Sequence, residues 1–239
     1  MSFLELRSLV KNFGGLRAVD NFSLSLEEGS VNALVGPNGC GKSTLFNLIT
    51  GALRPDSGHV FFKGEDITGL APHLIARRGI GRKFQVPAIF DELTARENLV
   101  VAARGAVRQT EIADIEALIR LSDVAAREAG ELAHGQKQWL EIGMLLAQAP
   151  SLILLDEPTA GMTEAETRAT AELILTINQQ QKVTILVIEH DMAFIQYLGC
   201  PLHVMSKGRI LKSGSFADIR RDPEVRALYF GTHEALNHA

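Results

Sequence analysis

Cysteine is almost absent from this sequence, which holds only Cys40 and Cys200 among its 239 residues. The two thiols could pair in principle, but Cys40 lies inside a glycine-rich loop whose backbone has another use, described below. We therefore expect two reduced thiols, as in a cytosolic protein, rather than a disulfide scaffold. No group of cysteines and histidines in the sequence has the spacing of metal ligands.

Long hydrophobic runs are also missing. No apolar run approaches the roughly 18 residues that a membrane-spanning helix needs. Residues 1–7 carry charge where a secretory signal would need an apolar core. If the protein works at a membrane, we expect another chain to span it.

The sequence has no excess of positive charge, since 24 Lys and Arg stand against 28 Asp and Glu. This balance does not favour non-specific nucleic-acid binding, which rests on a basic surface, although it leaves a local basic patch open. The hydrophobic content of 46% and the charged content of 22% are those of an ordinary globular protein.

The sequence does contain short apolar strand patterns that alternate with helical ones. Two segments alternate apolar and polar residues, which predicts half-buried antiparallel strands: residues 3–9 and 22–26. Three segments are continuously or largely apolar, as expected of buried parallel strands: residues 31–35, 152–155 and 184–188. Residues 204–211 read as a hairpin that turns at Lys207 and Gly208.

Two helix starts are marked by capping boxes, Thr94 with Glu97 and Thr163 with Glu166. Residues 86–147 are mostly helical in pattern and contain no apolar strand run. Strands therefore flank a helical insert, which predicts an α/β core that carries a helical subdomain.

A glycine-rich motif follows the strand pattern at residues 31–35 and precedes a helical segment. It matches G-x-x-x-x-G-K-[ST] and consists of Gly36, Pro37, Asn38, Gly39, Cys40, Gly41, Lys42, Ser43 and Thr44. In such a loop the backbone amides and the helix N-terminus surround phosphate oxygens. We expect Lys42 to reach the β- and γ-phosphates of ATP, and Ser43 to ligate Mg²⁺. The alternative is a glycine-rich turn that arose by chance.

Two carboxylates, Asp156 and Glu157, end the apolar run at residues 152–155. Asp156 is suited to hold Mg²⁺ through water, and Glu157 is then placed to polarise the attacking water. The alternative is a strand end with two solvated acids.

A second anion site is suggested by residues 132–136, which we expect to form a loop before a helix at residues 137–148. A loop glycine at a helix N-terminus can hold an anion, but taken alone the segment reads as a plain helix cap.

In this order the motifs resemble the nucleotide-binding subunits of ABC transporters, and the resemblance covers residues 3–230. Residues 132–136 occupy the place of the signature motif, and residues 159–163 the place of the D-loop. Gln85 matches the Q-loop glutamine, and His190 matches the switch histidine. Phe13 stands where the family stacks an aromatic ring on adenine. Taken alone, each of these side chains would be a surface or packing residue.

The resemblance implies one ABC ATPase domain over residues 1–239, an α/β fold of P-loop NTPase (RecA-like) type with an antiparallel β subdomain and an α-helical subdomain. Residues 1–85 and 148–230 would form the nucleotide-binding core with the β subdomain. Residues 86–147 would form the helical signature subdomain, and residues 231–239 a C-terminal tail.

The implied cofactors are ATP and Mg²⁺. The catalytic set would be Glu157, His190, Gln85 and Lys42. Besides the glycine-rich loop and Phe13, the ATP contacts would come from the signature residues of a facing subunit: Ala133, His134, Gly135 and Gln136. The Mg²⁺ ligands would be Ser43, Gln85 and Asp156.

The sequence departs from the commonest family pattern at three positions. Ala133 replaces the signature serine, which removes one hydroxyl donor to the γ-phosphate. His134 replaces a glycine and supplies either a different contact or none. Thr163 stands where many D-loops have aspartate. These changes concern the strength of the contact made across the dimer.

The chain resembles the branch that takes up hydrophobic amino acids and amides. Residues 79–85 and 134–144 are most similar to the ATP-binding subunits of urea transporters, which implies an importer of urea or short-chain amides. Branched-chain amino-acid importers are the alternative, because none of these residues touches the solute.

The resemblance also implies partners. A second ATP-binding subunit, a copy or a companion chain, would form a head-to-tail dimer. Two transmembrane permease subunits would carry the solute, and a periplasmic solute-binding protein would act indirectly. We expect a peripheral position on the cytoplasmic face of the inner membrane, and no nucleic-acid partner. The apolar residues Val86, Pro87, Ile89 and Phe90 are candidates for permease docking, or else ordinary subdomain core.

Two further classes stay open from the sequence. One is a soluble ABC ATPase of DNA repair, translation or cluster assembly, although the long coiled coils of repair types and the paired cassettes of translation types are missing. The other is a regulatory subunit that binds ATP without hydrolysing it.

Overall fold

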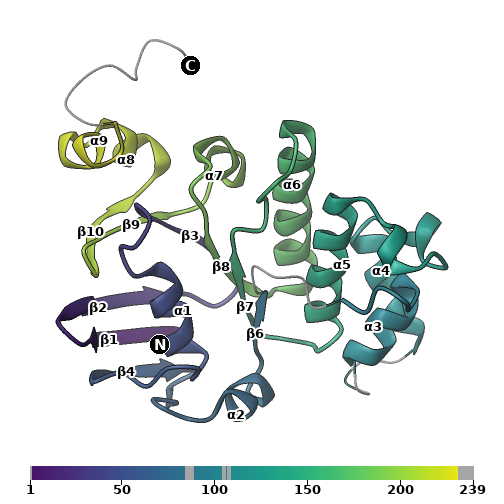
Figure 1. Ribbon diagram of the computed structural model, residues 1–239, viewed down its shortest axis with the longest axis horizontal. Coiled ribbons are helices and arrows are strands. Elements are labelled where there is room, and N and C mark those ends of the chain that lie inside the picture. The colour runs from purple at the N-terminus through teal and green to yellow at the C-terminus, as the bar shows by residue number, and fades with distance from the viewer. Residues whose placement is uncertain (1, 84–88, 104–105, 107–108, 231–239) are drawn as a thin grey trace.

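The computed structural model describes residues 2–83, 89–103, 106 and 109–230. These residues form two β-sheets with helices packed around them (Figure 1). The order of strands is β2-β1-β4-β5 in a four-stranded sheet and β10-β9-β3-β8-β7-β6 in a six-stranded sheet. The predicted α/β core with an antiparallel part and a helical part is confirmed.

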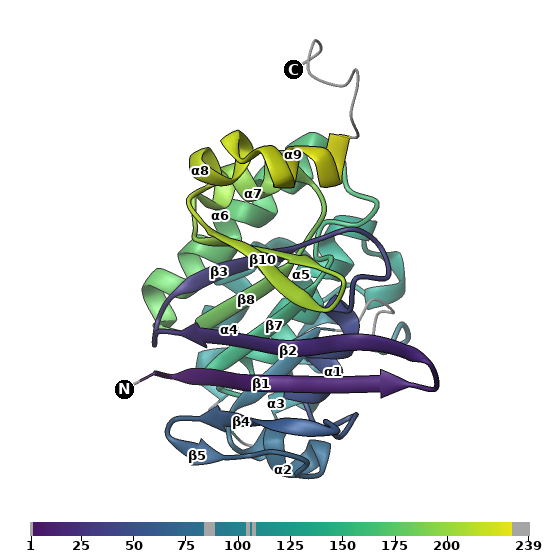
Figure 2. The ribbon, with the colours of Figure 1, turned by 90° about the vertical axis from the view of Figure 1, so that its left-hand side faces the viewer.

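The four-stranded sheet is antiparallel and covers one side of the molecule (Figure 2). Its strands are β1 (Leu4–Phe13), β2 (Leu16–Leu26), β4 (Ser57–Phe62) and β5 (Glu65–Asp66). The two predicted strands are confirmed, but the hairpin that they form extends further, to Phe13 and Leu16. The alternation of apolar and polar residues in β1 stops before the strand does, because the pairing register with β2 shifts between Leu6 and Leu9 and again beyond Leu9.

The six-stranded sheet is parallel except at one edge. Its strands are β3 (Val31–Val35), β6 (Ile80–Lys83), β7 (Leu152–Asp156), β8 (Thr184–Ile188), β9 (Leu202–Ser206) and the antiparallel β10 (Arg209–Gly214). Every residue of β3, β7 and β8 is buried, as their apolar patterns predict. The predicted hairpin turn is confirmed, and Lys207 and Gly208 both have positive φ there.

Helices cover both faces of this sheet. On one face, α1 (Lys42–Ile49) packs its buried side chains between the two sheets, in a core that includes Phe22, Leu34 and Leu186. The other helices of the core part are α2 (Pro72–Arg77), α6 (Glu164–Gln181), α7 (Met192–Leu198), α8 (Phe216–Arg221) and α9 (Pro223–Phe230). None of the described helices is both long enough and apolar enough to cross a membrane.

The helical part lies at one end of the molecule (Figure 1). It consists of α3 (Ala95–Ala103), α4 (Gln109–Leu118), α5 (His134–Leu146) and the short 3₁₀ helices η1 (Ser122–Val124) and η2 (Ala129–Glu131). The described residues between 89 and 147 form no β-strand, in agreement with the sequence pattern. The division of the chain at residues 86 and 147 stays a prediction.

Candidate active site

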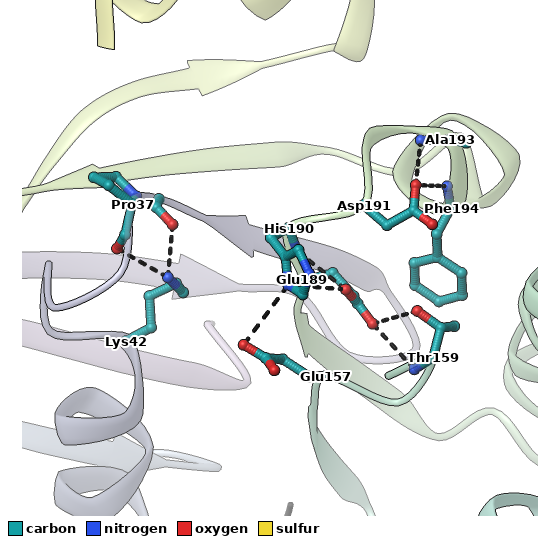
Figure 3. Close-up of polar contacts among 10 residues, drawn as sticks. Pro37, Lys42, Glu157, Thr159, Glu189, His190, Asp191, Ala193 and Phe194 are labelled. Atoms are coloured by element: carbon teal, nitrogen blue, oxygen red, sulfur yellow. Dashed lines mark hydrogen bonds and ion pairs between the residues drawn. The ribbon is translucent and has the colours of Figure 1, made fainter. Parts of the chain in front are cut away.

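The candidate site lies at one edge of the parallel sheet, where β3, β8 and β7 end side by side. The phosphate loop (residues 36–44) follows β3, Glu189 and His190 follow β8, and Asp156 and Glu157 close β7. Because the carboxyl ends of parallel strands meet at one edge, segments far apart in the sequence converge there (Figure 3).

Two glycines of the phosphate loop are required by close approach. A Cβ atom at Gly36 would collide with the carbonyl oxygen of Met205, and one at Gly41 with the carbonyl oxygen of Ala18. Gly41 also has a φ of 111°, which side-chain-bearing residues rarely adopt. Larger residues here would push the loop away from the hairpins that support it.

Lys42 opens α1 and is buried, and its Nζ donates to the carbonyl oxygens of Gly36 (2.6 Å) and Pro37 (3.1 Å). This ammonium therefore lies inside the curve of the loop (Figure 3). Asn38, Gly39 and Ser43 are exposed, and Thr44 is half-buried. A loop with a buried cation and an open rim at a helix N-terminus is suited to hold phosphate oxygens.

Cys40 packs beneath the loop and is 6% exposed. Burial raises the pKa of its thiol, and burial raises the pKa of Cys200 to about 11. Both cysteines are free, as the sequence predicts. A thiolate forms at neither site near neutral pH, so thiol reagents should attack Cys40 only slowly.

Asp156 is 2% exposed, and its Oδ2 accepts a hydrogen bond from Arg82 Nη2 at 2.9 Å. Its Oδ1 has no hydrogen-bond partner among the described residues. A buried carboxylate oxygen without a partner fits Mg²⁺, which prefers oxygen ligands and keeps several waters, and Ser43 is an exposed residue that offers a hydroxyl oxygen on the phosphate loop. In the described part of the chain no group of three or more His, Cys, Asp or Glu could hold a metal, so the substrate phosphates would have to complete the set.

Glu157 has a left-handed backbone, with a φ of 49°. Its N–H donates to the Ile188 carbonyl at 2.9 Å, which holds this conformation in place. Its Oε1 lies 3.7 Å from Nδ1 of His190, whose side chain is 61% exposed. A strained backbone conformation that surrounding contacts enforce is typical of functional positions.

Phe13 ends β1 at the tip of the long hairpin and is 46% exposed. Lys11 places its Nζ 5.7 Å from the ring centre. The hairpin approaches the phosphate loop through Ala18, which lies against Gly41. An exposed aromatic ring on the hairpin that touches the phosphate loop is available to stack on a base.

The signature segment (residues 132–136) differs from the sequence expectation, because α5 starts at His134 and not at residue 137. Ala133 is the extended N-cap residue, and its N–H donates to Oε1 of Gln136 at 3.0 Å. The Gln136 side chain thus caps the first turn of α5 although the N-cap residue has no hydroxyl. Because alanine is not a typical N-cap residue, the sequence does not reveal that the helix starts here.

Two further signature residues, His134 and Gly135, contact the D-loop segment (residues 159–163) and the start of α6 in the same chain. His134 Nε2 lies 2.9 Å from the Ala160 carbonyl oxygen. Gly135 is buried so closely that a Cβ atom would lie 2.8 Å from Oε1 of Glu166. The substituted histidine thus makes a definite contact within its own subunit.

Gln85, Val86 and Pro87 lie outside the residues that the structure describes, so their roles stay predictions. Sequence reasoning missed two residues that the structure brings to the site, Arg82 and Glu189. Glu189 had a signal, since it is a carboxylate directly after the buried strand β8. Arg82 had none, because its partner Asp156 is distant in the sequence.

Comparison with known families gives one clear match. Residues 19–160 match the family model described as ABC transporter. The high-affinity branched-chain amino acid transport ATP-binding protein BraF of Pseudomonas aeruginosa is 37% identical, over 95% of this chain and 97% of that protein. The corresponding LivG protein of Escherichia coli is 35% identical over the same shares.

Solved structures agree with the sequence comparison. The ADP conformation of MJ1267, an ATP-binding cassette of an ABC transporter, superposes with a TM-score of 0.88 at 33% identity, over 97% of this chain and 99% of that one. The cbiO1 protein from Clostridium perfringens, part of an ABC transporter complex, gives a TM-score of 0.83 at 26% identity, over 96% of each chain.

Proposed function

This chain belongs to the ABC transporter family, and from that premise we propose that it is the ATP-hydrolysing subunit of an importer of branched-chain amino acids. The catalytic part of this proposal rests on the placement of Lys42, Glu157 and His190 at one edge of the parallel sheet (Figure 3), where Asp156 is the last residue of β7. The solute is supported by the relatives named above, which are branched-chain amino acid transport proteins.

Nucleotide binding would rest on the phosphate loop. The amides of residues 36–44 would surround the phosphates, and Lys42 would neutralise charge on the β- and γ-phosphates. Phe13 would stack on the adenine. Ser43 and Asp156 would hold Mg²⁺, with Gln85 as a further ligand, and that ion would offset negative charge on the phosphate oxygens.

Hydrolysis would depend on Glu157 and His190. Glu157 is only partly exposed, which suits a carboxylate that orients an attacking water and accepts its proton. His190, close to the same carboxylate, would contact the γ-phosphate as negative charge develops on it. Glu157 is required for turnover and not for binding in this mechanism.

The signature segment would act across a head-to-tail dimer. Ala133, His134, Gly135 and Gln136 lie at the N-terminus of α5, whose partial positive charge would face the γ-phosphate held by another subunit. Since Ala133 supplies no hydroxyl, the backbone amides of this turn would carry the contact. ATP would then favour the closed dimer by its higher affinity for it.

The permease would dock on the helical part. Phe90, Val100 and Val101 are about half exposed, whereas Ile89 packs partly into the core. Exposed apolar side chains gathered on one subdomain are suited to a protein partner. Docking there would hold the chain at the cytoplasmic face of the membrane.

Urea is less well supported as the solute than the sequence resemblance implies. The segments that resemble urea-transporter subunits, residues 79–85 and 134–144, belong to the nucleotide machinery, and the relatives compared above are branched-chain amino acid transport proteins. Branched-chain amino acids are therefore our proposal, and urea is the competing outcome.

A reconstituted assay would test the solute directly. The chain, its permease partners and the associated solute-binding protein are placed in proteoliposomes, and phosphate release is measured with leucine or urea in saturating amounts. We expect leucine to stimulate ATP hydrolysis and urea to leave it at the basal rate. Stimulation by urea alone would reverse the assignment, with the Glu157→Gln subunit as the control for hydrolysis by contaminants.

A further inference from the structure

We infer that Glu189 is a positioning residue for ATP hydrolysis, because its buried carboxylate fastens the start of the D-loop segment to the backbone of His190. The inference rests on the proposed roles of Glu157 and His190 and adds a residue that does not itself touch ATP.

Glu189 makes three hydrogen bonds although only 1% of its surface is exposed. Oε1 accepts from Oγ1 of Thr159 at 2.6 Å and from the N–H of Thr159 at 3.1 Å. Oε2 accepts from the N–H of His190 at 3.0 Å (Figure 3). One carboxylate thereby joins two loops that follow different strands, β7 and β8.

The donors to the Glu189 carboxylate indicate that this residue holds the backbone in place and is not merely a buried charge. A carboxylate without donors would be strongly disfavoured in the interior, and here each oxygen has at least one. Two of the three donors are backbone N–H groups, so the side chain fixes main-chain positions. Hydrogen bonds to an ionised acceptor are also shorter and stronger than neutral ones.

The fastened segment is hydrogen-bonded to the turn that carries Glu157. The N–H of Ala160 donates to the Glu157 carbonyl at 3.3 Å, and the N–H of Glu157 donates to the Ile188 carbonyl at 2.9 Å. The turn is thus attached twice: the amide of Glu157 bonds to Ile188 of β8, and Thr159 bonds to Glu189, which follows β8. In our inference these two attachments set the distance between the Glu157 carboxylate and the His190 ring, which is 3.7 Å from Oε1 to Nδ1.

A purely structural role is the competing explanation, and the Glu189→Gln variant separates the two. An amide keeps the shape but turns an NH₂ group toward either the Thr159 or the His190 donors, which breaks one attachment. We expect kcat to fall about 10- to 100-fold while the Kd for ATP changes by less than about threefold, since the phosphate loop is untouched.

Glu116 provides the matched control. It is also buried, at 2% exposed, and it also uses both oxygens, on Arg96 at 2.6 and 2.7 Å, but it lies in the helical part. Glu116→Gln should lower stability without lowering kcat. Wild-type kcat in folded Glu189→Gln, or a parallel loss of ATP affinity, would overturn the inference.

A second variant covers the case in which Glu189→Gln does not fold. Thr159→Val keeps the volume of the side chain and removes only the hydroxyl donor to Glu189. We expect kcat to fall about 3- to 10-fold at unchanged ATP affinity, as the loss of one such hydrogen bond implies. Unchanged turnover in this variant would count against the inference on its own.

Combination with His190→Ala distinguishes this inference from the proposed function. If Glu189 acts by setting the separation of Glu157 and His190, Glu189→Gln should add little loss to His190→Ala, because that separation no longer matters once the imidazole is removed, whereas a full additional loss would overturn the positioning role. If His190→Ala alone keeps normal turnover, the proposed role of His190 fails, and with it positioning through that histidine.

Discussion

At the scale of single residues, the two carboxylates that end β7 show how environment separates neighbouring roles. Asp156 is buried and paired with Arg82, while Glu157 turns toward the partly open space near His190. The sequence predicts both acids, because they follow an apolar strand. It could not predict the pairing with Arg82, because that contact depends on β6 lying beside β7.

Glu157→Gln should retain ATP binding and lose most turnover. The amide cannot accept a proton from the attacking water, and a general base contributes about 10²- to 10⁴-fold. Phosphate release measures the loss, and calorimetric titration with ATP measures the binding. Near-normal hydrolysis by this variant would refute the role of Glu157, and Glu116→Gln serves again as the control.

His203 should make stability depend on pH. It is 8% exposed on β9, between Ser213 Oγ at 2.8 Å and Asn32 Oδ1 at 3.2 Å. Burial lowers its pKa below the usual 6.5. Below about pH 6.5 the unfolded chain therefore binds more protons than the folded chain. The contribution of His203 to the free energy of unfolding is fully present above that pH and is lost as the pH falls, by at most about 1.4 kcal/mol per pH unit.

Urea unfolding at pH 7.5, 6.5 and 5.5 measures this dependence. His203→Gln should reduce the slope of unfolding free energy against pH, whatever it does to the stability at pH 7.5. The exposed His73→Gln variant is the control and should keep the wild-type slope. An unchanged slope in His203→Gln would assign the pH dependence to other groups.

At the scale of elements, local chemistry decided which boundaries the sequence could predict. Both capping boxes are present, with Glu97 bound to Thr94 and Glu166 bound to Thr163. The start of α5 was missed because Ala133 has no capping side chain. Strands β4, β5 and β6 were not predicted either, because β5 has only two residues and neither β4 nor β6 shows a continuous apolar run or a regular alternation.

The two capping boxes form a matched pair for a test of the D-loop. Thr94→Ala and Thr163→Ala should each cost about 1 kcal/mol in urea unfolding, because each removes one N-cap acceptor. Only Thr163→Ala should also lower kcat, because Glu166 packs against Gly135 of the signature segment. Equal kcat in both variants would mean that this cap serves stability alone.

At the scale of the whole molecule, parallel topology explains why the catalytic motifs could be assigned from sequence at all. The motifs of Lys42, Glu157 and His190 each follow a buried strand, and adjacent parallel strands deliver their carboxyl ends to the same edge. The sequence order of the motifs does not reveal contacts that cross between subdomains. The contact of His134 with Ala160, which joins the helical part to the core part, appears only once the chain is folded, and so do the three hydrogen bonds that Glu189 makes within the core part.

Two subunits should associate when ATP is bound and cannot be hydrolysed. One phosphate loop covers one side of the γ-phosphate, and the signature segment of a second subunit would cover the other. The Glu157→Gln protein with MgATP should elute as a dimer in size-exclusion chromatography, and with MgADP as a monomer. A monomer under both conditions would exclude a dimer of identical chains and leave a companion subunit as the partner.

The most direct measurement of the central claim is calorimetric titration of the purified chain with MgATP, beside the Lys42→Ala variant. The account predicts saturable binding at one site per chain in the wild type and strongly weakened binding in the variant. Absence of saturable binding to the wild type, or equal affinity in the variant, would contradict it.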